Sequence, residues 1–212
     1  MSIGLFARED RTRIYLACDS KGTGPGGDTV ECKAFLLQSS PAVALVCTGG
    51  MPHWRLVRDL CAAGQVCATF EEAADRVKEL LTTEPGGPQV KAGNNACARI
   101  CGFSGPSREP RYYPIDLVAP ADMVPRRPAQ NGGTDPIGAA PDGIGQHVGP
   151  AVQKIQEALR GGADLGTAMR DGVKEAIRIA EEDHRGGNTT EQQVVGQARV
   201  WILDDSGSWR EV

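Results

Sequence analysis

The chain has 212 residues, of which 40% are hydrophobic and 24% are charged, and its formal net charge at pH 7 is −4. This length and composition are typical of one globular domain and exclude a disordered chain. The mild acidic balance does not favour nucleic acid or an anionic membrane as a partner, and no apolar run reaches the roughly 20 residues that a membrane-spanning helix needs. We therefore expect residues 1–212 to form a single domain with neither nucleic acid nor a membrane as a partner.

The amino-terminal sequence and the cysteines predict the cellular compartment of the protein. The start, MSIGLFARED, has one short apolar stretch with an acidic flank, whereas a signal peptide begins with basic residues and has a longer apolar region. The seven cysteines are odd in number, form no CxxC pair and lie mostly in apolar surroundings, as buried thiols in a reducing compartment do. We therefore expect a cytoplasmic protein. The spacing of Cys97 and Cys101 matches no zinc motif, and we expect neither a metal nor a cofactor.

The first fifty residues predict β-structure. Four short apolar runs, bounded by charged residues, Pro or Gly, have the continuity of strands that are covered on both faces. The expected strands are residues 2–7, 13–19, 34–38 and 42–48. Between the second and the third, the sequence GTGPGGD at residues 22–28 predicts a glycine-rich loop.

The spacing of apolar residues then becomes helical. Helices are expected over residues 52–63 and 70–81, and Thr69 and Glu72 stand at the capping-box positions of the second. A β-hairpin is expected next, with strands over residues 98–103 and 111–118.

The last part of the chain begins with residues 120–145, which are rich in Pro, Gly and Ala and predict a long surface loop. Helices follow over residues 144–159 and 165–182, the second with Asp164 as its cap. Strands are expected over residues 193–203 and 208–212.

The expected order is strands, two helices, strands, two helices, strands. Two sheets packed face to face, with a helix pair on each outer face, would cover every apolar stripe. The sequence therefore predicts an α/β fold of the four-layer αββα type.

Several motifs near the amino end resemble one known family. They are SIGLFA at residues 2–7, IYLACDSK at residues 14–21, Lys33 within ECKAFLL, and an apolar strand ending in TGG at residues 48–50 directly before a helix. In order and spacing they resemble proteasome β subunits and the HslV-type protease, which are N-terminal nucleophile hydrolases. The likeness in motifs is concentrated in residues 2–50, while the likeness in element order covers nearly the whole chain. That family has the αββα fold.

The resemblance implies a mechanism. In this family a Thr, Ser or Cys at a freed N-terminus attacks the scissile carbonyl, and its own α-amine is the base. Ser2 is then the nucleophile, Lys33 lies beside the amine, Asp19 pairs with Lys33, and the N–H of Gly49 faces the oxyanion. A serine hydroxyl needs such a base, and an α-amine, which titrates at about 8, has its pKa lowered by a nearby ammonium. Glycine allows the close approach that an oxyanion donor needs.

Ser2 directly follows Met1. A methionine before a small residue is usually removed, so no propeptide would be required. Most members of the family have threonine as the nucleophile, so serine is a departure. The alternative interpretation of Ser2 is a small residue at the start of a strand.

Two further positions depart from the family pattern. The family has a serine in a Gly-Ser-Gly-like turn, where residues 137–140 (IGAA) carry Ala139. Near the end of the last long helix the family has an aspartate followed three residues later by a serine. Asp183 matches the aspartate, but residue 186 is Gly186. Two supporting hydroxyls are therefore missing, and Asp183 has an alternative role as a solvated residue at a helix end.

Three functions remain open. The resemblance implies a peptidase subunit of a homo-oligomeric ring, which encloses the sites, takes peptides or unfolded proteins, and works with an ATPase or other gatekeeper that the sequence does not identify. The missing hydroxyls favour a catalytically inactive, proteasome-like structural subunit. The same nucleophile would also serve an amidase acting on a small amide. A Ser-His-Asp triad is disfavoured because no GxSxG elbow is present.

Overall fold

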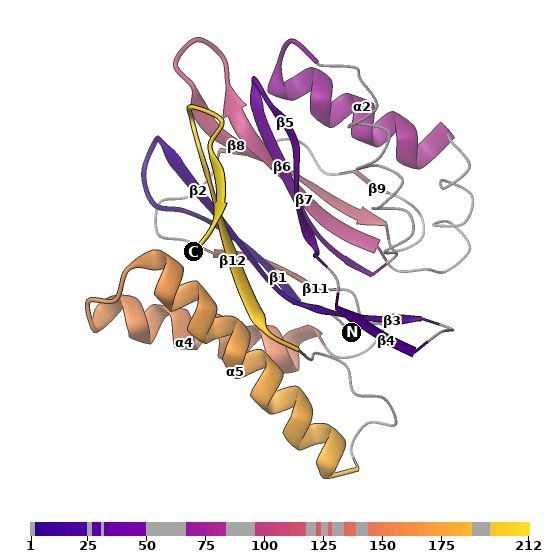
Figure 1. Cartoon of the computed structure of the whole chain (residues 1–212), viewed down its shortest axis with the longest axis vertical. Helices are drawn as coiled ribbons and strands as arrows, with labels where there is room; N and C mark the ends of the chain where they lie inside the picture. The colour runs from indigo at the N-terminus through magenta and orange to yellow at the C-terminus, as the bar shows by residue number, and fades with distance from the viewer. Residues whose placement is uncertain are drawn as a thin grey trace.

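Two antiparallel sheets stack face to face between layers of helices (Figure 1). The structure is a computed structural model that describes residues 3–24, 27–30, 32–49, 67–83, 96–117, 122–123, 127–128, 134–138, 144–187 and 196–212. The expected helix over residues 52–63 lies outside these residues.

The first sheet has five strands in the order β11, β1, β2, β12, β13. Their bounds are β1 Ile3–Arg8, β2 Arg13–Asp19, β11 Thr134–Gly138, β12 Ala198–Asp204 and β13 Trp209–Glu211.

The second sheet runs in the order β10, β8, β7, β6, β5, and β9 also pairs with β8. Their bounds are β5 Ala34–Ser39, β6 Ala42–Gly49, β7 Ala96–Ser104, β8 Glu109–Leu117, β9 Asp122–Met123 and β10 Arg127–Pro128. A separate two-stranded hairpin consists of β3 Lys21–Gly24 and β4 Gly27–Val30.

Side chains alternate across the strands and thereby fill three apolar layers. The layer between the two sheets includes Phe6 and Leu16 from the first sheet and Ala44 and Val46 from the second. Helices α4 (Ile144–Arg160) and α5 (Leu165–Arg185) cover the outer face of the first sheet. Helix α2 (Phe70–Thr83) covers the outer face of the second sheet. The predicted αββα fold class is therefore confirmed.

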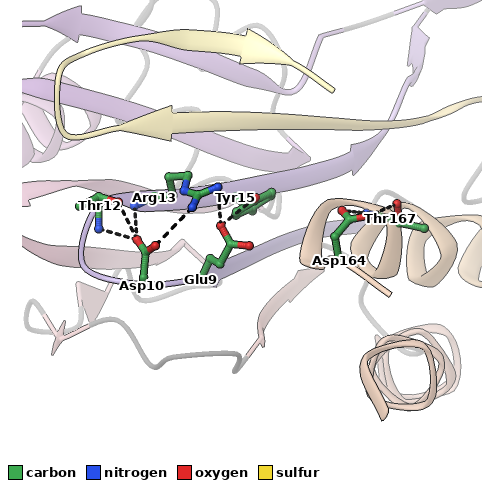
Figure 2. A network of polar contacts seen from close by, with 7 residues as sticks. All are labelled: Glu9, Asp10, Thr12, Arg13, Tyr15, Asp164 and Thr167. Atoms are coloured by element: carbon green, nitrogen blue, oxygen red, sulfur yellow. Dashed lines mark hydrogen bonds and ion pairs between the residues drawn. The ribbon is translucent and has the colours of Figure 1, made fainter. Parts of the chain in front are cut away.

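Local hydrogen bonds explain where two of the helices begin. The carboxylate of Asp164 accepts from the Thr167 backbone N–H at 2.9 Å and from its hydroxyl at 2.7 Å, as predicted for the cap of α5 (Figure 2). The backbone bond in particular holds the pKa of Asp164 below its usual value. At α2, the Thr69 hydroxyl accepts from the Glu72 N–H at 3.1 Å. The Glu72 carboxylate reaches back to the N–H of Ala68, one residue before the position expected for a capping box.

The turn between β1 and β2 is held by its own two acidic residues, Glu9 and Asp10. Asp10 accepts from the backbone N–H and the hydroxyl of Thr12, both at 2.7 Å. Glu9 pairs with Arg13 at 2.9 Å and accepts from the Tyr15 hydroxyl at 3.1 Å (Figure 2). These hydrogen bonds and the ion pair stabilise an exposed hairpin turn and suggest no further role.

Two predicted loops are wrong. Residues 22–28 contain most of the β3–β4 hairpin, because backbone pairing between Lys21–Gly24 and Gly27–Val30 requires no apolar alternation. Residues 120–145 contain β9, β10 and β11 and the first residues of α4. Strand β11 adds to the edge of the first sheet by backbone pairing with β1, which apolar periodicity does not reveal.

The remaining predicted elements differ mainly at their ends. The last long strand begins at Ala198, after Gly196 and Gln197, whereas the sequence predicted a strand from residue 193. Helix α5 continues to Arg185, three residues beyond the expected end. Among the helices of the described ranges, none is both long enough and apolar enough to cross a membrane.

The hairpin turns of both sheets meet at one end of the sandwich. In the β12–β13 turn, Gly207 has φ +90° and touches the Ser39 carbonyl of the β5–β6 turn so closely that a Cβ atom would lie 2.2 Å from that oxygen. The N–H of Asp205 donates to the carbonyl of Thr12 at 3.0 Å, and Arg108 of the β7–β8 turn donates to the Asp205 carbonyl at 3.0 Å. The free ends of these hairpins therefore lie at the opposite end of the sandwich.

Candidate active site

Three predicted site positions, Asp19, Lys33 and Gly49, lie at or beside strand ends away from the turns, as does Ile3. Strand β1 begins at Ile3, β2 ends at Asp19, Lys33 directly precedes β5, and β6 ends at Gly49. Because β1–β2 and β5–β6 are hairpins whose turns meet at the other end, these positions converge. Ser2, the expected nucleophile, immediately precedes Ile3 and lies outside the described residues.

A buried ion pair joins the two sheets at this end. The ammonium of Lys33 lies 2.6 Å from Oδ2 of Asp19, and both side chains are 0% exposed. The other carboxylate oxygen, Oδ1, accepts from the backbone N–H of Ile3 at 2.9 Å. Removing two charges from water is costly, and the short contact and the backbone hydrogen bond together offset that cost. Through Asp19, the Lys33 ammonium is therefore linked to the backbone of Ile3, the residue that follows Ser2 in the sequence.

The backbone of Lys33 is fixed to β6. Its carbonyl accepts from the N–H of Cys47 at 2.8 Å and from the Cys47 thiol at 3.3 Å. Backbone N–H groups alternate in direction along a strand, and the ladder between β6 and β7 is regular through Gly49. The N–H of Gly49 therefore points to the same edge of β6 as that of Cys47, towards the chain that carries Lys33.

Two thiols near the ion pair are held in the neutral form. Burial is the main cause that raises the pKa of Cys18 and of Cys47 far above the ordinary value, and the nearby Lys33 ammonium only partly opposes it. A neutral, fully buried thiol is a poor nucleophile. Burial therefore makes both Cys18 and Cys47 unsuitable as the catalytic nucleophile.

Ser20 is a polar site residue to which the sequence assigned no role. It is 3% exposed, and its hydroxyl accepts from the Gln197 N–H at 2.9 Å. This contact ties the start of β12 to the residue that follows Asp19. The Asp-Ser-Lys triplet was visible in the sequence, but the partner lies 177 residues away and only the tertiary structure reveals it.

Three further positions were predicted to support the site, namely Asp183, Gly186 and Ala139. Asp183 is half-buried in the last turn of α5. Gly186 terminates that helix, with its N–H donating to the Glu182 carbonyl at 2.8 Å. Ala139 is outside the described residues. Within the described part of the chain, no cluster of three or more His, Cys, Asp or Glu residues could hold a metal ion.

Comparisons with known proteins reveal likeness in structure rather than in sequence. No protein-family model matches the chain, and no curated protein matches it. Among solved structures, Anbu, described as an ancestral beta-subunit, from Yersinia bercovieri has a TM-score of 0.63 at 16% identity, covering 99% of this chain and 86% of that chain.

Two more solved structures have the same architecture. A Gly-1 mutant of Anbu from Hyphomicrobium sp. strain MC1 has a TM-score of 0.63 at 14% identity over 100% of this chain and 86% of that chain. Eukaryotic HslV from Trypanosoma brucei has a TM-score of 0.56 at 14% identity over 96% and 99% of the respective chains. At these identities the likeness concerns the fold. The chain therefore has the proteasome-like αββα fold that Anbu and HslV share.

Proposed function

We propose that this chain is a proteasome-like N-terminal nucleophile hydrolase that cleaves peptide bonds with Ser2 after Met1 has been removed. The observation that carries the proposal is the buried Asp19–Lys33 pair, whose carboxylate also holds the N–H of Ile3. A buried ion pair is weak as a stabilising device. An ammonium fixed beside a free N-terminus instead has a clear chemical use.

Each group has a role in the first step. The Ser2 hydroxyl attacks the carbonyl carbon and forms a C–O bond while its proton passes to the α-amine of Ser2. The Lys33 ammonium lowers the pKa of that amine, so that it is an unprotonated base near neutral pH. The N–H of Gly49 donates to the developing oxyanion.

The remaining steps complete the turnover. The C–N bond breaks as the α-amine returns the proton to the leaving amine, which leaves an ester on Ser2. Water then hydrolyses the ester, with the α-amine again acting as the base, and regenerates the free hydroxyl. Peptides or unfolded proteins are the substrates, held by subunits of a homo-oligomeric ring in the cytoplasm. An ATPase or other gatekeeper would control entry.

A second candidate is a catalytically inactive structural subunit of the same fold. Gly186 favours it, because this residue ends α5 without a hydroxyl where the resemblance implies a serine. Ala139 likewise lacks the expected hydroxyl. An amidase that acts on a small amide would use the same groups without a chamber.

The deciding experiment is mass spectrometry of the purified protein before and after treatment with an electrophilic peptide, such as a peptide vinyl sulfone. We expect a chain without Met1 and one adduct mapped to Ser2. The Ser2→Ala variant is the matched control and should form no adduct. Retention of Met1 throughout, or no adduct on Ser2 in the trimmed chain, would contradict the peptidase and favour the inactive subunit.

A further inference from the structure

Thr48 is a buried polar residue at the site end that the proposed mechanism does not use. It is 0% exposed, and its hydroxyl has no hydrogen-bond partner among the residues that the structure describes. A buried hydroxyl without a partner costs free energy, so such a group calls for an explanation. Thr48 lies between Cys47, which is bonded to Lys33, and Gly49, the proposed oxyanion donor.

The pleat of β6 determines the direction of the Thr48 side chain. Ala42, Ala44 and Val46 lie in the layer between the sheets, whereas Val43, Leu45 and Cys47 face α2. Thr48 continues the first series, so its hydroxyl enters the space between the sheets. The Asp19–Lys33 pair bridges the two sheets at this same end.

A chain of contacts leads from the amino end of β1 to Thr48. The N–H of Ile3 is bonded to Asp19, Asp19 is paired with Lys33, and the Lys33 carbonyl is bonded to Cys47, the neighbour of Thr48. Ser2 directly precedes Ile3 in the sequence, at the amino end of this chain of contacts.

We propose that Thr48 is a positioning residue whose Oγ1 accepts a hydrogen bond from the α-amine of Ser2. The inference rests on the proposed function for its purpose. An amine that donates one N–H to Thr48 has its lone pair turned away from Thr48 and free to accept the Ser2 proton. Because an ammonium donates more strongly than an amine, this contact also raises the pKa of the amine and partly opposes the effect of Lys33.

The test uses protein prepared with Ser2 as its first residue by cleavage of an N-terminal tag, in wild-type, Thr48→Val and Thr48→Ser forms. Thermal unfolding gives the first readout. We expect Thr48→Val to lower the midpoint by about 2–4 °C, since the amine loses its acceptor, and Thr48→Ser to restore it. If the hydroxyl had no partner, valine would remove a penalty and the midpoint would rise or stay unchanged, which would overturn the proposal.

The second readout is the pKa of the α-amine, measured from the pH dependence of its acylation. We expect Thr48→Val to lower this pKa by about 0.5–1 unit, with Thr48→Ser close to wild type. Thr12→Val, in the turn at the opposite end of β1, is the control and should leave the pKa unchanged. An unchanged amine pKa in Thr48→Val overturns the proposal.

Neither readout requires hydrolysis, so the two proposals can fail separately. An adduct on Ser2 together with an unchanged amine pKa would contradict the role of Thr48 and leave the peptidase standing. A shifted amine pKa without any adduct would contradict the peptidase and leave the contact standing.

Discussion

The Lys33 ammonium is buried inside the protein beside the carboxylate of Asp19. Both side chains of the Asp19–Lys33 pair are fully buried, and Asp19 also accepts the N–H of Ile3. Removing one member of such a pair leaves an uncompensated charge, which costs far more than the pair contributes. Stability and activity therefore depend on Lys33 for different reasons, and variants can separate them.

We expect Lys33→Met to abolish peptide hydrolysis and to lower the free energy of unfolding by about 3–5 kcal/mol, because the buried Asp19 carboxylate loses its counter-ion. Urea denaturation measures the second effect. The double variant Asp19→Asn with Lys33→Met should recover most of the stability but no activity, since an amide oxygen still accepts from Ile3 and no charge remains.

Lys174→Met is the matched control for this experiment. Lys174 pairs with Asp171 at 3.7 Å on the surface, where its side chain is 62% exposed. Exposed pairs contribute about 0–1 kcal/mol, so little change is expected. A similarly small loss in Lys33→Met would show that the Asp19–Lys33 pair is not buried in solution.

At the scale of elements, the packing of α4 against α5 depends on a glycine. A Cβ atom at Gly172 of α5 would lie 2.6 Å from Cγ1 of Ile155 and 2.8 Å from the carbonyl oxygen of Ala151, both on α4. Gly149, also on α4, is exposed, and beyond its chain neighbours and the backbone of its own helix no atom lies within 4 Å of such a Cβ. Close packing between the helices therefore requires glycine at position 172 but not at position 149.

We expect Gly172→Ala to lower the free energy of unfolding by about 1–3 kcal/mol through overpacking. Gly149→Ala should change it by less than about 1 kcal/mol, because the helix preference of alanine is opposed by the contact of its Cβ with the following Pro150. Urea denaturation followed by circular dichroism compares the two. Equal effects of the same sign would contradict the close helix contact.

Elements whose side chains pack on a core were predictable, and those held only by backbone pairing were not. Strand β6 and helix α5 bury apolar residues at spacings visible in the sequence. Strand β11 joins the first sheet at its edge through backbone hydrogen bonds to β1, and the β3–β4 hairpin is likewise a backbone ladder. Neither β11 nor the β3–β4 hairpin has a regular spacing of apolar residues that would reveal it in the sequence.

At the scale of the whole molecule, the sandwich has two unlike ends. The turns of the hairpins close one end through the Gly207–Ser39 contact and the bonds of Asp205. The other end contains Asp19, Lys33 and Gly49 and carries the proposed chemistry. In the proposed ring, this second end would face the inner chamber.

We expect native mass spectrometry to show an assembly of many identical chains, because the proposed peptidase encloses its sites in a homo-oligomeric ring. Dilution of the sample is the control, since a specific ring keeps its size as the concentration falls. A monomer or dimer would contradict the chamber and favour the amidase that acts on a small amide.

The sequence by itself determined the layers of this protein. Strand and helix periods, and the order of those elements, predict two sheets between helices, because every apolar stripe must be covered. Asp19 and Lys33 could be singled out only through their resemblance to a family, since nothing in their spacing shows that they meet.

Only the tertiary structure decided that Asp19 and Lys33 meet and which polar groups lie beside them. The hairpins bring Asp19 and Lys33 to one end and bury both, and they enclose the hydroxyls of Ser20 and Thr48 nearby. Burial and hydrogen bonding of polar groups depend on which strands face each other across the sandwich. That arrangement joins residues far apart in the chain, so local sequence patterns do not contain it.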